Sequence, residues 1–155
     1  EPHRSMLALG RTAFVMQKIE SGFPAFVGNV WERLCQAAVS GNQLFGHTWN
    51  MARRWWGKTP VYEAGRKTPI GFEELEFDVV AEAADDKDTI LVGECKWKSA
   101  DYADRLLMKL KAKTEKAPFA QGKNIVYVLF LKERPLSEAD CRMMFPDDVL
   151  KCLPE

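Results

Sequence analysis

The sequence predicts a single α/β domain in which helices flank a mixed central sheet. Three features of the 155-residue chain support this prediction. Strand-like alternation lies near the middle of the chain, amphipathic helical patterns lie on both sides of it, and the segment 123–132 (KNIVYVLFLK) is apolar enough for a strand buried on both faces. A chain of this length can build one hydrophobic core.

The N-terminal part of the chain is predicted to be helical. Residues 1–20 are expected to form a linker or an N-terminal helix that could continue from an upstream module. A second helix is predicted from Ser21 or Pro24 to about Gly41, because apolar residues recur there at helical spacing. The domain proper is therefore expected to span residues 21–155.

Three strands are predicted next. The aromatic-rich segment 43–56 is expected to be the first strand, followed by a loop rich in glycine and proline at 57–71. Residues 72–83 (FEELEFDVVAEA) alternate between apolar and acidic side chains, and a turn at 84–88 joins them to the apolar strand 88–98 as an antiparallel hairpin. The alternation is expected to place Leu75, Phe77 and Val79 on one face and Glu74, Glu76 and Asp78 on the other.

The C-terminal part is predicted to begin with the clearest helix of the chain. Residues 101–118 place an apolar stripe opposite a basic stripe. Because this helix lies between the hairpin and the buried strand at 123–132, we expect a crossover connection and parallel pairing. A short helix is predicted at 136–144 and a last edge strand at 148–153.

The charge is balanced overall but unevenly distributed. Lys and Arg number 22, as do Asp and Glu, which does not indicate strong nucleic-acid binding by the whole surface. Residues 73–94 carry a net charge of −8, whereas residues 50–71 carry +4 and residues 95–123 carry +5. An acidic centre between basic arms suits a metal-dependent site that acts on a polyanion, although chance can also produce it.

Composition bears on the cellular location. The four cysteines form no CxxC pair and no cluster with histidine at zinc-binding spacing, which favours buried free thiols in a reducing cytoplasm. No segment approaches the ~20 consecutive apolar residues of a membrane span. We therefore expect a cytoplasmic protein that does not contact membranes.

The hairpin is expected to bring together charged residues that could form a catalytic site. Pairing Asp78 with Glu94 or Cys95 centres the turn near residue 86, so the two carboxylates are expected to be cross-strand neighbours with Cβ atoms ~5 Å apart. Lys96 lies one pleat further along the same face. Carboxylates this close repel each other, and a hard cation such as Mg²⁺ or Mn²⁺ would relieve the repulsion. A plain ion pair between Glu94 and Lys96, worth ~0–1 kcal/mol if exposed, is the alternative.

The spacing of Asp78, Glu94 and Lys96, an Asp on one strand and Glu-x-Lys on the next, resembles the PD-(D/E)XK nuclease superfamily. Residues 28–32 (GNVWE) match its helical G-x-x-x-E pattern, whereas the proline that precedes the Asp in the superfamily is absent. In detail, FVGNVWERL, ELEFDVVAE and ILVGECKWK look like the C-terminal domain of archaeal-type DEXX-box (AAA-like) ATPases.

This resemblance implies a restriction-endonuclease-like αβββαβ core and metal-dependent hydrolysis of phosphodiester bonds in DNA. It implies that Asp78, Glu94, the carbonyl of Cys95 and, as an auxiliary ligand, Glu32 hold Mg²⁺ or Mn²⁺, and that Lys96 is the catalytic lysine. Glu32, Asp78 and Glu94 would thus share the catalytic role with Lys96. Glu76 could belong to the site or pair with Lys96.

The same resemblance implies partners. DNA is the expected substrate, and an upstream ATPase module in the same polypeptide is expected; a homodimer is left open. The alternative function is a non-catalytic nucleic-acid-binding, protein-interaction or regulatory domain of an ATPase. Trp55 and Trp56 could stack on nucleic acid or belong to the core. The residues expected to contact DNA are Arg53, Arg54, Lys98, Lys109 and Lys113.

Overall fold

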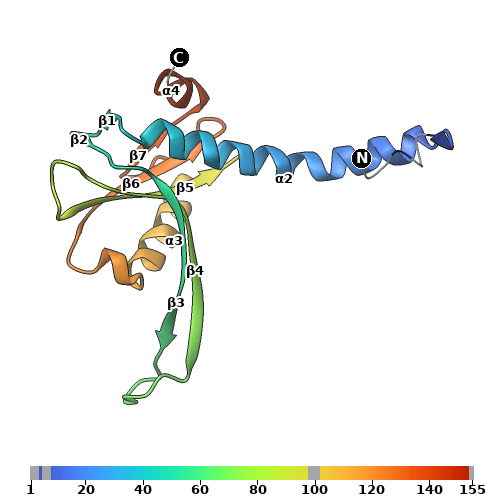
Figure 1. Ribbon diagram of the computed structural model, residues 1–155. Helices are drawn as coiled ribbons and strands as arrows, with labels where there is room; N and C mark the ends of the chain where they lie inside the picture. The colour runs from blue at the N-terminus through green and yellow to red at the C-terminus, as the bar shows by residue number, and fades with distance from the viewer. Residues whose placement is uncertain (1–3, 5–7, 98–101, 154–155) are drawn as a thin grey trace.

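A computed structural model describes residues 4, 8–97 and 102–153 of the chain, so Lys98 lies outside the described residues. Figure 1 shows the arrangement of the elements. In chain order they are α2 (Thr12–Val39), β1 (Gln43–Leu44), β2 (His47–Thr48), β3 (Arg53–Val61), β4 (Gly71–Glu82), β5 (Thr89–Lys96), α3 (Ala103–Glu115), the 3₁₀ turn η1 (Pro118–Ala120), β6 (Asn124–Leu131), β7 (Arg142–Met144) and α4 (Pro146–Lys151).

The centre of the molecule is a mixed five-stranded sheet in the order β3-β4-β5-β6-β7. The first three strands are antiparallel, and β6 runs parallel to both β5 and β7. Helix α2 covers one face through buried residues such as Cys35 and Ala38, and α3 covers the other through Leu107 and Leu110. The prediction of an α/β fold with a mixed sheet between helices is therefore confirmed.

Strands β4 and β5 separate part of the way along their length. Their ladder runs from Glu82↔Ile90 to Val79↔Gly93 and stops there. Beyond this point β4 continues with β3 as a two-stranded ribbon that curves away from β5 (Figure 1). The register would place Asp78 opposite Glu94, one step past the last pair, so both residues lie where the two strands fork.

A β-bulge lies beside this fork. The register between β3 and β4 shifts from Arg53↔Val80 to Trp55↔Phe77, so β4 holds one more residue than β3 across this step. Phe77 consequently joins the core on the α3 side, whereas Val79 joins the core on the α2 side. The prediction that these two residues share a face is wrong, because a bulge resets the alternation of side chains.

Gly93 allows the sheet to pack closely at the end of the ladder. A Cβ added there would lie 2.7 Å from the ring of Phe130 on β6 and 3.1 Å from the Cβ of Val79 on β4. The indole of Trp31 on α2 donates a hydrogen bond to the carbonyl of Phe130 at 3.3 Å. Gly93 therefore leaves room for the contacts that join α2 to the sheet.

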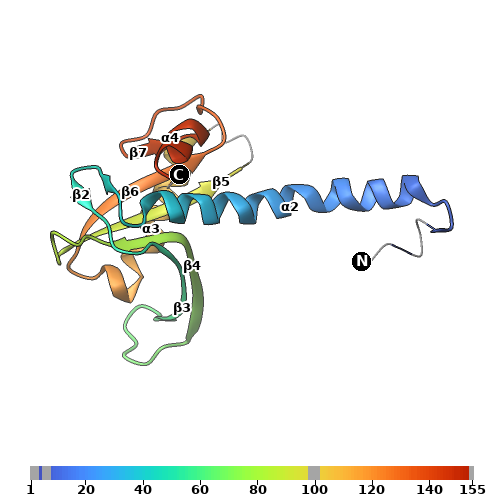
Figure 2. The same cartoon turned by 45° about the horizontal axis from the view of Figure 1, so that its top comes forward.

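Helix α2 is longer than the sequence suggests and is continuous across Ser21 and Pro24, where a helix start was expected. Its C-terminal part, from Trp31 onward, packs on the sheet. Its N-terminal part runs away from the other elements in both views (Figure 1 and Figure 2) and exposes large apolar side chains. The exposed apolar residues include Met16, Ile19, Phe23, Phe26 and Val30. Within the described residues, no helix is both long and apolar enough to cross a membrane.

Three local predictions are wrong. The segment 43–56 is not one strand: β1 and β2 form a small hairpin, in which Phe45 and Gly46 adopt positive φ. The longer strand β3 begins at Arg53 and extends to Val61, so the loop expected at 57–71 is confined to residues 62–70. Residues 136–144 end in β7 because Met143 pairs with Leu129 on β6. Residues 146–151 form a helix, with a proline in its first turn and Asp148 accepting the backbone N–H of Phe145.

Candidate active site

Hydrogen bonds from strand β5 and from helix α2 hold Asp78 at the fork. Its Oδ2 accepts the backbone N–H of Cys95 on β5 at 2.7 Å, a bond that replaces the next rung of the ladder. Its backbone carbonyl accepts a hydrogen bond from the amide of Gln36 on α2 at 2.8 Å. The carboxylate of Asp78 thus lies between the two strands, close to the plane of the sheet.

Glu94 lies on the α3 side of β5 and is bound by two lysines. The Nζ of Lys96 lies 2.7 Å from Oε1, and the Nζ of Lys113 on α3 lies 3.0 Å from Oε2. The ammonium of Lys113 also lies 4.6 Å from the centre of the Phe77 ring, a cation–π distance. Lys96 therefore shares a face with Glu94, as predicted, and Lys113 reaches the same carboxylate from the helix.

Glu32 approaches the fork from the opposite helix. It is half-buried on α2, one turn before Gln36. Its charge interacts with Asp78, Glu94 and Lys96, and with Arg54 on β3. Arg54 forms an ion pair with Glu76, so Glu76 contacts Arg54 where the sequence left open a pairing with Lys96. The cluster thus draws on both faces of the sheet at the point where β4 leaves β5.

The carboxylates of the cluster differ in how their charge is balanced. Burial raises the pKa of Asp78, and the nearby charge of Glu94 raises it further. Burial also raises the pKa of Glu32, with a further contribution from Asp78. Burial alone would raise the pKa of Glu94 as well, but the bonds and charges of Lys96 and Lys113 outweigh it and lower that pKa. The cations near Asp78 and Glu32 therefore offset the effect of burial only in part.

Lys96 stays protonated in this arrangement. Burial favours its neutral form, but the hydrogen bond and the charge of Glu94 prevail and raise the pKa of Lys96. An amine that holds its proton cannot act as a general base at neutral pH. Its chemistry is that of a hydrogen-bond donor and a positive charge.

The donors at the fork fit a hard divalent cation in their chemistry. Asp78, Glu94 and Glu32 offer carboxylate oxygens, and a carboxylate that already accepts one hydrogen bond keeps further acceptor sites. Burial raises the pKa of the Cys95 thiol, as does the neighbouring thiol of Cys35, so Cys95 can offer only its carbonyl. In the part of the chain that the structure describes, no group of three or more His, Cys, Asp or Glu side chains is spaced to hold a metal ion. A cation here would take two carboxylates and several waters, as Mg²⁺ commonly does.

Some of the residues expected to contact DNA are exposed, whereas others are bound to carboxylates. Arg53 and Lys109 are exposed on β3 and α3. Arg54 lies beside the cluster and forms an ion pair with Glu76, and Lys113 forms an ion pair with Glu94. The positive charge of each residue is therefore matched by a carboxylate. Trp55 is half-buried against Phe77 and Phe119, as a core residue would be, whereas Trp56 is exposed.

Two residues that contact the cluster were not predicted from the sequence to belong to the site. Gln36 follows Glu32 at i+4, the spacing that puts two residues on one helix face, and this spacing could have flagged it. The pairing of Lys113 with Glu94 depends on how α3 packs on the sheet, and no local pattern signals it. Lys113 was predicted only as a residue that contacts DNA.

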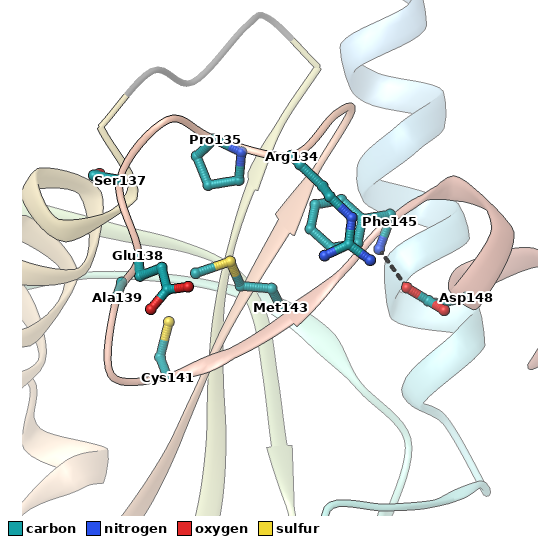
Figure 3. Close-up of a pocket in the computed structure, with 9 residues that line it drawn as sticks. All are labelled: Arg134, Pro135, Ser137, Glu138, Ala139, Cys141, Met143, Phe145 and Asp148. Carbon is teal, nitrogen blue, oxygen red and sulfur yellow. Dashed lines mark hydrogen bonds between the residues drawn. The ribbon is translucent and has the colours of Figure 1, made fainter.

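A separate surface hollow of about 520 Å³ lies between the β6–β7 connection and the start of α4 (Figure 3). Three of the residues that line it interact with neighbouring groups. Asp148 accepts the N–H of Phe145 at 3.0 Å, the guanidinium of Arg134 lies 5.0 Å from the Phe145 ring, and Ser137 bonds to Asp104 at 2.7 Å. This hollow does not share residues with the cluster at the fork.

Fold and cluster together define an α/β protein with carboxylates and lysines gathered where two strands of a mixed sheet diverge. The chain matches the DUF234 family, described as "Archaea bacterial proteins of unknown function", over residues 1–115, a range that includes the whole cluster from Glu32 to Lys113. The protein therefore belongs to the DUF234 family. No curated protein and no solved structure matches it significantly.

Proposed function

We propose that this protein is a metal-dependent deoxyribonuclease that hydrolyses phosphodiester bonds within DNA. One observation carries the proposal: Asp78, Glu94, Glu32 and Lys96 gather at the fork, and nearby cations offset only part of the effect of burial on Asp78 and Glu32. A group of partly buried carboxylates beside a protonated lysine suits a divalent cation and a phosphate.

The order of the elements supports the finer fold proposal. Apart from the small β1–β2 hairpin and the η1 turn, helix α2, strands β3, β4 and β5, helix α3 and strand β6 follow the αβββαβ order of a restriction-endonuclease-like core. The resemblance of the sequence to PD-(D/E)XK nucleases rests on residues that lie at the fork. The same resemblance is our reason to propose an ATPase module as the upstream neighbour, Mg²⁺ or Mn²⁺ as cofactor and the cytoplasm as location.

In the proposed reaction, a water oxygen bonds to phosphorus and one P–O ester bond breaks, which leaves a phosphate monoester and an alcohol. Asp78, Glu94 and the carbonyl of Cys95 would hold the cation, with Glu32 nearby. A divalent cation held there would supply Lewis acidity to the phosphate and would lower the pKa of a bound water. Lys96 donates to a phosphate oxygen as negative charge develops there. To do so it must exchange its bond to Glu94 for one to the phosphate.

A non-catalytic role is the second candidate. Both oxygens of Glu94 are bound by ammonium groups, which is the state expected of a structural ion-pair network. A nucleic-acid-binding or regulatory domain of an ATPase could keep such a network without cleaving anything. The two candidates differ in whether the cluster binds a divalent cation.

Plasmid nicking separates the two candidates. The purified chain is incubated with supercoiled plasmid and Mg²⁺ or Mn²⁺, beside Asp78→Ala and Lys96→Ala. We expect the unmodified chain to nick the plasmid and both substitutions to reduce the rate at least about 100-fold, as losses of catalytic charge commonly do. Lys151→Ala, an exposed lysine on α4 outside both the cluster and the residues expected to contact DNA, serves as the control and should leave nicking in place.

Two results, obtained together, would contradict the nuclease proposal. These are the absence of nicking on supercoiled, linear and single-stranded DNA, together with the absence of Mn²⁺ binding by calorimetry. Nicking that survives both Asp78→Ala and Lys96→Ala would point to a contaminating nuclease.

A further inference from the structure

Trp56 on β3 is a large aromatic side chain directed into solvent. Its exposed fraction is 77%, whereas the adjacent Trp55 packs against Phe77 and Phe119 with ring centroids 5.8 Å and 4.8 Å away. Within the described residues, Trp56 has neither an aromatic neighbour at stacking distance nor a cation over its ring. A tryptophan so exposed is uncommon on a protein surface, and tryptophan is enriched at binding sites.

The face of the ribbon that carries Trp56 is defined by the strand register. Trp55 and Phe77 point toward α3, so Trp56, which is opposite Glu76 on β4, points away from that helix. An ion pair flanks Trp56 on each side, Arg54 with Glu76 and Lys58 with Glu74. The result is a flat apolar ring between two paired charges on the exposed face of a two-stranded ribbon.

This face is continuous with the candidate active site. Arg54, the neighbour of Trp56 on the same face, interacts electrostatically with Glu32. Trp56 is opposite Glu76, two residues before Asp78 on β4. At ~3.3 Å per residue in a strand, the backbone of Trp56 lies on the order of 7 Å along the ribbon from that of Asp78. Stacked nucleotides rise ~3.4 Å each, so this span matches roughly two nucleotides.

We propose that the ribbon face from Arg54 through Trp56 to Lys58 binds an unpaired DNA strand and that a nucleobase stacks on Trp56. The proposal rests on the nuclease function proposed above and names its substrate class as DNA with a single-stranded segment beside the cleaved bond. The ring requires an unpaired base, because bases within a duplex already stack on one another. A phosphate of the same strand then reaches the fork.

The charges of the ribbon predict how binding depends on salt. Arg54 and Lys58 are matched by Glu76 and Glu74, so the face carries no net positive charge. Counterion release therefore contributes little, and stacking supplies most of the affinity. We expect log K to fall with log[salt] with a slope of magnitude below about 1, a smaller value than a basic groove would give.

Fluorescence anisotropy with a labelled oligothymidylate and a blunt duplex of equal length tests the proposal. The measurement is made in EDTA, so that cleavage does not enter. We expect the oligothymidylate to bind more tightly than the duplex. Trp56→Leu should weaken its binding about tenfold, whereas Trp56→Phe, which keeps a flat ring, should change it by no more than about twofold.

Several outcomes would overturn the proposal. Equal affinity of Trp56→Leu and the unmodified chain would show that the ring does not bind the strand. A preference for blunt duplex, or no binding of oligothymidylate by a chain that nicks plasmid, would reject the substrate class and leave the nuclease proposal intact. Binding that depends on Trp56 in a chain that neither nicks DNA nor binds Mn²⁺ would support this surface and reject the nuclease function.

Discussion

At the scale of single residues, Asp78 and Glu94 carry the same charge but contribute to stability with opposite sign. Asp78 accepts one backbone N–H and, among the described residues, has no ammonium bound to it. Glu94 binds the ammonium groups of both Lys96 and Lys113. This difference yields two predictions for the dependence of stability on pH.

Asp78→Asn should stabilise the protein at neutral pH. A carboxyl group whose pKa is higher in the folded state binds more protons when folded, so its ionisation lowers stability as the pH rises above the ordinary carboxyl range near 4. The amide oxygen can still accept the N–H of Cys95. Thermal midpoints measured across pH should show a gain for Asp78→Asn at neutral pH that disappears below about pH 4.

Glu94→Gln should have the opposite effect. The pKa of Glu94 is lowered on folding, so its charge stabilises the fold above its unfolded pKa, and this stability is lost as the pH falls through the folded pKa. The substitution leaves two lysines without their partner. We expect a loss of about 2 kcal/mol at neutral pH, less than the ~3–5 kcal/mol of a fully buried pair, because water still reaches both lysines. Urea unfolding at neutral and acidic pH would measure it, and an equal loss at both would contradict this account.

Lys113→Met should strengthen the binding of Mn²⁺ in the absence of DNA. Lys113 lies 3.0 Å from Oε2 of Glu94, where its positive charge competes with a cation for the same carboxylate. Removing that charge should raise the affinity several-fold as measured by calorimetry. Lys109→Met, the same change of charge one helical turn away at an exposed position, is the matched control. Equal effects of the two substitutions would show that only net charge matters.

At the scale of the elements, Gly93 determines how closely β4, β5 and β6 pack. Gly93→Ala places a methyl group 2.7 Å from the Phe130 ring, so either the ring or the strand must move. We expect a loss of about 1–3 kcal/mol in the free energy of unfolding, typical of overpacking in a core. Gly71→Ala on β4, where an added Cβ meets nothing within 4 Å, should cost much less. Chemical denaturation of both variants makes the comparison.

The elements that the sequence predicted are those with local signals. The hairpin of β4 and β5 follows from alternation and a turn of suitable length, and β6 follows from its unbroken apolar run. The bulge beside Asp78 has no such signal, because it is a mismatch between two strands. Strand β7 was missed because it depends on pairing with β6, whereas α4 began with a proline and two acids that could have been recognised.

The candidate site was predictable to a similar extent. Sequence spacing indicated Asp78, Glu94 and Lys96, and the hairpin register places Asp78 one step beyond the last pair of the ladder. The roles of Gln36 and Lys113 depend on how two helices dock on opposite faces, which no segment encodes alone. The exposure of Trp56, in contrast to Trp55, follows from the face that α3 covers.

At the scale of the whole molecule, the protein is a packed body with a helical extension. Removing residues 1–25 should leave the thermal midpoint close to that of the full chain, because the buried contacts of α2 with the sheet begin at Trp31. Removing residues 1–33 should lower it strongly, since Trp31 and its bond to Phe130 are then lost. Differential scanning fluorimetry compares the two. Equal thermal midpoints for the two truncated chains would contradict the placement of the boundary between the helical extension and the packed body.

The continuity of α2 connects the exposed extension to the candidate site. The helix has 28 residues, a length of about 42 Å at ~1.5 Å per residue. Its exposed end carries Met16 and Phe23, and its docked end carries Glu32 and Gln36. Because the helix is continuous, a molecule that binds its exposed end would contact the same helix whose Gln36 donates a hydrogen bond to the backbone carbonyl of Asp78.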